Sequence, residues 1–165
     1  MIVIADASPL IFLAKLDLLG LIEKLFGDSI LVPQRVVDEV LRPPIPAGEE
    51  ILLDKFLSHR CKVEHIKHPQ FFVSAMSCAD SEVITLAIRK KADYILADDR
   101  IVRDVALVEV IRPIGTLGII LKAYSKKLLS LEKAQDSFYA LVRQHNFRIS
   151  IKVYDAFQEK LRTME

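Results

Sequence analysis

Short apolar runs alternate with longer helical patterns along most of this sequence, and this alternation restricts the fold more than any other feature. The strand-like runs cover residues 1–5, 29–32, 62–66, 93–97 and 109–111. Helical patterns separate them. Chains with this order form parallel sheets whose two faces are covered by helices. We therefore predict a three-layer α/β/α fold with a central parallel sheet.

The end of the sequence contains helical patterns alone. A helix over residues 115–126 is followed by amphipathic patterns at 131–145 and 151–161. We predict one α/β domain over residues 1–125, and a helical extension over 126–165 that packs on the core or at a dimer interface.

The charge balance limits the classes of partner. The chain has 23 basic and 22 acidic residues, for a net charge of +1, so it lacks the basic surface of a bulk nucleic-acid binder. Any nucleic-acid contact must be local. No apolar run reaches the roughly 20 residues of a membrane span, and the first residues lack a signal-peptide pattern. We expect a cytoplasmic protein that is not bound to a membrane.

Acidic residues stand where two of the predicted strands end. Asp6 follows the first run, and Asp98 and Asp99 follow the apolar part of the fourth. Because functional sites on parallel sheets form at the carboxyl ends of the strands, we expect these side chains to converge. Ser8 would support Asp6, and with Pro9 it also suits the start of a helix.

Two more acids lie on helices that can pack beside those strand ends. Glu39 lies off the apolar stripe of a helix that ends near residue 41, and Asp80 lies near the start of the helix over 79–89. Glu82 follows Asp80 by two residues and therefore points elsewhere, as a supporting residue or ion-pair partner. Taken singly, Glu39 also suits a solvated surface, and Asp80 and Asp99 suit helix caps.

Several carboxylates in one place repel each other and raise their pKa values, and a bound cation relieves that repulsion. Mg²⁺ and Mn²⁺ prefer such oxygen ligands and can activate water for attack on a phosphodiester. Asp6 is the predicted central ligand, and Asp80 and Asp99 are two further ligands. Asp98 would support them and also contact the metal. Glu39 would hold or deprotonate the attacking water. Arg100 and Arg103, just beyond the acidic pair, would bind RNA phosphates or form a solvated charged face.

Four blocks of the sequence, in this order, resemble the PIN-domain family: IADASPLIFLAKL, VPQRVVDEVL, ADSEVITLAI and YILADDRIVRDVA. The resemblance is closest to a prokaryotic PIN-like branch related to the VapC toxins of toxin–antitoxin pairs. In that branch, Asp6, Glu39 and the acid at position 80 have counterparts. Ala79–Asp80 replaces the usual Gly–Glu, and Ala97 stands where many members carry Thr, Asn or Asp.

The resemblance implies a Mg²⁺- or Mn²⁺-dependent ribonuclease, commonly a homodimer, with an antitoxin protein as a possible partner. The alternative within the family is a catalytically inactive module that binds RNA or protein. A different doubly wound protein is disfavoured. Ser8 stands where a haloacid-type phosphatase needs a second Asp, and the late Lys at a strand end that a receiver needs is not visible. A Walker phosphate loop is absent.

Overall fold

A computed structural model describes residues 1–164. The chain forms two compact units, one from Met1 to Thr116 and one that begins at Leu117. The first unit contains the sheet, and the described part of the second is helical.

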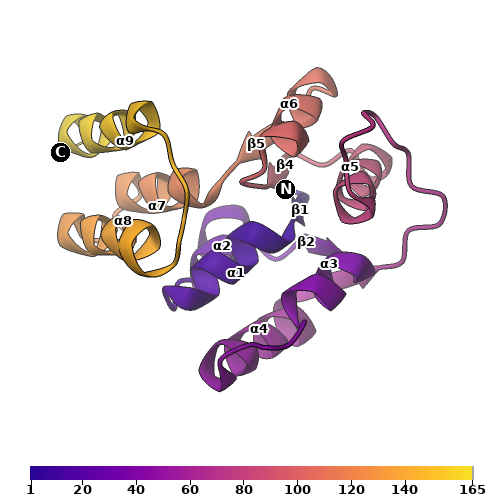
Figure 1. The fold of residues 1–165 in the computed structure, drawn as a ribbon, viewed down its shortest axis with the longest axis horizontal. Helices are drawn as coiled ribbons and strands as arrows, with labels where there is room; N and C mark the ends of the chain where they lie inside the picture. Colours follow the sequence, from indigo (N-terminus) through magenta and orange to yellow (C-terminus); the bar gives the residue numbers. More distant parts are fainter. Residues whose placement is uncertain (165) are drawn as a thin grey trace. The chain divides into compact units, whose positions relative to one another are not determined.

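The first unit is built on a parallel sheet with the strand order β3-β2-β1-β4-β5. Figure 1 labels four of these strands, β1, β2, β4 and β5. Its strands are β1 (Val3–Ala5), β2 (Ile30–Pro33), β3 (Cys61–Glu64), β4 (Tyr94–Leu96) and β5 (Arg112–Ile114). The chain runs from β1 towards one edge through β2 and β3, then crosses over to β4 and continues to the other edge. The strand order therefore reverses between β1 and β4, which is where ligands bind in open α/β sheets.

Helices connect the strands and cover the sheet. They are α1 (Ala7–Lys15), α2 (Gly20–Phe26), α3 (Gln34–Val40), α4 (Ala47–Arg60), α5 (Cys78–Lys90) and α6 (Arg100–Val108). The α5 helix packs against β1, β2 and β4, and most of its residues are buried. Since β1 is fully buried as well, the core lies on both sides of the central strand. The predicted α/β/α fold is confirmed.

One predicted strand is wrong. Residues 109–111 form the turn that ends α6: Val110 has a φ of +60°, and the N–H groups of Val110 and Ile111 donate to the carbonyls of Leu107 and Ala106. These two bonds satisfy carbonyls that a helix end leaves unpaired. The actual strand, β5, contains Pro113, which cannot donate a ladder hydrogen bond but is tolerated in an edge strand.

The second unit consists of helices in its described part. The α7 helix (Thr116–Ser125) spans the boundary between the units, and α8 (Leu131–Gln144) and α9 (Ile151–Thr163) follow it. Phe138 stacks on Phe157 with ring centroids 4.4 Å apart, which joins α8 to α9 in a small aromatic core. None of the helices in residues 1–164 is long and apolar enough to cross a membrane.

Candidate active site

Two of the predicted acids lie at the point where the strand order reverses. Asp6 follows β1 directly, and Asp98 follows β4 by two residues. The strands are held in register by the pair Ala5–Leu96, and the N–H of Asp6 donates to the carbonyl of Leu96 at 2.9 Å. The backbone thus places both acids at the same edge of the sheet.

Asp6 is buried, with 4% of its surface exposed, and it also begins α1. Its Oδ1 accepts a hydrogen bond of 2.7 Å from the N–H of Ala7. The prediction that Ser8 begins this helix is therefore wrong. Asp6 has an extended backbone and a side chain that reaches the first helical N–H, so it is the single residue between the end of β1 and the start of α1.

Burial and the charges of other acids both affect the pKa of Asp6. Burial raises the pKa of this carboxyl to about 7, although the Ala7 N–H lowers it. The charges of Asp80, Glu39 and Asp98 raise it as well, so these three carboxylates lie close enough to act on Asp6. Four of the five predicted acids, at the ends of β1 and β4 and on α3 and α5, therefore interact electrostatically through Asp6.

Asp98 is held by the start of α7. Its Oδ1 accepts from the N–H of Thr116 at 2.7 Å, and its Oδ2 accepts from the Thr116 hydroxyl at 2.6 Å. Burial raises the pKa of Asp98, whereas the Thr116 bonds and the charge of Arg103 lower it. Both oxygens are already engaged, which fits the predicted supporting role.

Gly115 leaves room for this arrangement. A Cβ at this position would lie 2.6 Å from Asp98 Oδ1 and 2.7 Å from Arg103 Nη1. A side chain here would force Asp98 or Arg103 to shift, so glycine lets both side chains approach the backbone.

The other two acids of the group lie on helices. Asp80 forms a reciprocal cap at the start of α5: its Oδ2 accepts from the N–H of Ser77 at 3.0 Å, and Ser77 Oγ accepts from the N–H of Asp80 at 3.1 Å. Its Oδ1 accepts no described hydrogen bond. Glu39 is exposed near the end of α3. Asp80 and Glu39 therefore keep oxygens that can serve a ligand.

Asp99 has a different position. Its side chain is the cap of α6, where Oδ1 accepts from the N–H groups of Ile101 at 2.8 Å and Val102 at 3.1 Å. The residue is exposed. The structure gives Asp99 a capping role, and the site proposed below does not use it as a metal ligand.

The predicted supporting and basic residues are placed as follows. Glu82 is an ion-pair partner, as expected, because its Oε1 accepts from Arg35 Nε at 2.9 Å. Arg103 faces Asp98, while Arg100 is 3.5 Å from Asp104 on the surface of α6. Ser8 is half-buried in the first turn of α1, and no hydrogen bond of its side chain is described.

Sequence reasoning missed three residues of this site: Thr116, Gly115 and Arg35. The hydroxyl absent at Ala97 is supplied to Asp98 by Thr116, which comes from a different element. A glycine and a threonine between a strand and a helix are the available signal for the first two. Arg35 lies four residues before Glu39, but nothing in the pattern indicates its partner, Glu82.

No three His, Cys, Asp or Glu side chains in residues 1–164 are gathered closely enough to hold a metal ion. The electrostatic convergence on Asp6 is compatible with this finding, because charges interact over longer distances than the 2.0–2.6 Å or so of metal–oxygen bonds. The donor chemistry nevertheless fits a hard divalent cation. All four groups are carboxylates, and a cation beside the buried Asp6 would favour its ionised form.

The fold and site define a doubly wound α/β protein with Asp6 and Asp98 at the reversal of strand order. The family model DUF3368, described as PIN domain, matches residues 2–163, and the chain belongs to this PIN-domain family, whose members are generally nucleases. A search of curated proteins found no match.

Among solved structures, the chain is similar to a PilT N-terminus domain protein, SSO1118, from the archaeon Sulfolobus solfataricus. The two are 15% identical with a TM-score of 0.53, and the match covers 72% of this chain and 90% of that one. At this identity the likeness concerns the fold.

Proposed function

We propose that this protein is a metal-dependent ribonuclease that hydrolyses phosphodiester bonds at the site around Asp6. The supporting observation is a buried Asp6 at the reversal of strand order, whose carboxyl is affected by the charges of Asp80, Glu39 and Asp98. Ionising four carboxylates together is unfavourable without a counter-charge. Carboxylates in such an unfavourable arrangement are typical of sites that bind a cation and a phosphate.

Mg²⁺ or Mn²⁺ is the proposed cofactor, and when bound it would neutralise phosphate charge and lower the pKa of a water molecule. Asp6 and Asp80 would hold the ion through oxygens that the described hydrogen bonds leave available. Asp98, fixed by Thr116, would support them. Glu39 would accept a proton from the water that adds to phosphorus as the bond to the ribose oxygen breaks, and the departing ribose oxygen would take a proton from solvent.

The test is cleavage of a panel of labelled RNAs by the wild-type protein and by Asp6→Asn, each with Mn²⁺, with Mg²⁺ and with chelator. Asparagine keeps the oxygen that caps α1 but loses the negative charge. Metal-dependent cutting that disappears in the variant would support the proposal. Equal traces in both proteins would indicate contamination and favour the inactive binding module.

The resemblance to toxins supplies further proposals that the same protein can test. A toxin would arrest growth on expression, and an antitoxin would offer an Arg to the carboxylates in place of metal. A homodimer and a cytoplasmic location are proposed on the same basis.

A further inference from the structure

Arg35 lies beside the acids of the proposed site. It precedes Glu39 by four residues on α3, and residues at this spacing lie one above the other on the same face of a helix. Both side chains are exposed. The two residues are therefore about one helical turn apart on α3.

Glu82 holds this guanidinium group by one edge. Arg35 Nε donates to Glu82 Oε1 at 2.9 Å, and the two side chains are 55% and 6% exposed, respectively. Glu82 lies on α5, two residues after Asp80. The ion pair thus joins the two helices that carry Glu39 and Asp80, and its buried partner limits the orientations of the exposed one.

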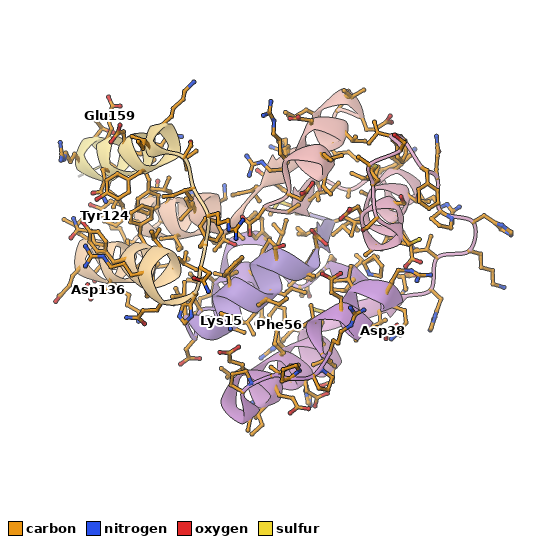
Figure 2. The ribbon with its side chains drawn as sticks, viewed as in Figure 1. Lys15, Asp38, Phe56, Tyr124, Asp136 and Glu159 are labelled. Atoms are coloured by element: carbon orange, nitrogen blue, oxygen red, sulfur yellow. The ribbon has the colours of Figure 1, made fainter. Side chains whose placement is uncertain are left out.

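The other edge of the guanidinium group is available. Within residues 1–164, the described hydrogen bonds and ion pairs of Arg35 use Nε and leave Nη1 and Nη2. The described hydrogen bond of Asp38, which is labelled on α3 in Figure 2, comes from Gln34 and does not use these two nitrogens. Two parallel N–H groups on a fixed plane match two oxygens of a phosphate.

RNA needs such a cation here. Four carboxylates repel a polyanion, and the net charge of +1 gives no general attraction. The basic residues expected from the sequence are less suitable, since Arg103 faces Asp98 and Arg100 is 92% exposed beside Asp104.

We propose that Arg35, oriented by the buried Glu82, binds a phosphate of single-stranded RNA next to the phosphate that is cut. This inference rests on the proposed function. Arg35 is a substrate-binding residue, and Glu82 is a positioning residue that acts through it.

The experiment measures binding of a fluorescein-labelled single-stranded RNA at several salt concentrations in chelator, with Asp6→Asn as the background so that the RNA is not cut. Arg35→Gln should weaken binding about tenfold, which is typical of a lost charged hydrogen bond. The plot of log association constant against log salt concentration has a negative slope, and its magnitude should decrease by about 0.7, since one phosphate contact is lost.

Arg60→Gln is the matched control. Arg60 is also 55% exposed and also ion-paired, to Glu23 at 2.8 Å, but it ends α4. It should leave affinity and slope unchanged. Arg35→Lys keeps the charge but not the two-pronged geometry, so it should retain the slope and lose part of the affinity.

A merely structural Arg35 would give a different result. Because Arg35→Gln leaves the buried Glu82 without its partner, the double variant Arg35→Gln/Glu82→Gln is measured as well, and circular dichroism checks that each protein is folded. If both variants match Arg60→Gln in affinity and slope, the inference is overturned. A wild-type protein that never cuts RNA, but whose Asp6→Asn variant binds RNA through Arg35, would refute the nuclease and leave the contact standing.

Discussion

Replacing Asp6 by Asn should stabilise the metal-free protein at alkaline pH, although it removes the central residue of the site. The asparagine side chain is not charged, but its oxygen can still accept from the N–H of Ala7, so the start of α1 is retained. The substitution therefore isolates the free energy of ionising a buried carboxyl beside Asp80, Glu39 and Asp98.

The magnitude follows from the pKa of Asp6, which burial raises from 3.8 to about 7. At 1.36 kcal/mol for each pKa unit, ionisation in the folded chain costs about 4 kcal/mol more than in the unfolded chain. Because the folded pKa is raised, this group's contribution to stability is complete below about pH 4 and is lost as the pH rises through 7. The stability advantage of the variant should grow by about 3 kcal/mol between pH 5 and pH 8.

The assay is urea unfolding of both proteins at pH 5 and pH 8 in chelator, and again in Mn²⁺. Metal binds the ionised carboxyl, so Mn²⁺ should narrow the gap at pH 8. Asp99→Asn, at an exposed helix cap, is the control and should show no such growth. A variant that is no more stable than wild type at pH 8, or a gap that stays flat with pH, would refute the reasoning.

Three further substitutions test the packing. Gly115→Ala should lower the free energy of unfolding by about 1–3 kcal/mol, because its Cβ would lie 2.6 Å from Asp98 Oδ1, whereas Gly20→Ala, with nothing within 4 Å, should not; urea unfolding compares them. Val110→Gly should raise the free energy of unfolding by about 1 kcal/mol, since a β-branched residue occupies a left-handed position there. An unchanged or lower melting temperature would contradict this prediction. Gln158→Met should add about 1 kcal/mol, because Nε2 is buried without a described hydrogen-bond partner, and a loss of stability in urea would show that the amide is satisfied.

Most of the fold could be predicted because the strands are buried apolar runs and the helices keep clear periods. The exception at residues 109–111 has a physical cause. Val110 adopts a left-handed conformation that β-branched residues rarely take, and Pro113 lies in an edge strand where its missing N–H costs little. The local sequence does not indicate the conformation of Val110 or the edge position of Pro113, since both depend on where the sheet ends.

The site could be predicted only in part. Asp6 and Asp98 follow from the rule that parallel strands end at functional edges, and that rule requires no tertiary detail. The difference between Asp98 and Asp99 does depend on tertiary detail. Asp98 accepts hydrogen bonds from Thr116, which is distant in sequence, whereas Asp99 accepts them from the first turn of α6. The Arg35–Glu82 pair is likewise long-range, and no local pattern indicates it.

The most direct test compares Mn²⁺-dependent cleavage of one labelled RNA by Asp80→Asn and Asp99→Asn. Each substitution keeps a side-chain oxygen that can accept the hydrogen bonds at the start of its own helix, α5 for residue 80 and α6 for residue 99, so both proteins should fold. We predict that Asp80→Asn lowers the rate by about a hundredfold or more and that Asp99→Asn cuts at close to the wild-type rate. Equal loss in both variants would contradict the four-acid site, and full activity in Asp80→Asn would contradict the role of these carboxylates in the reaction.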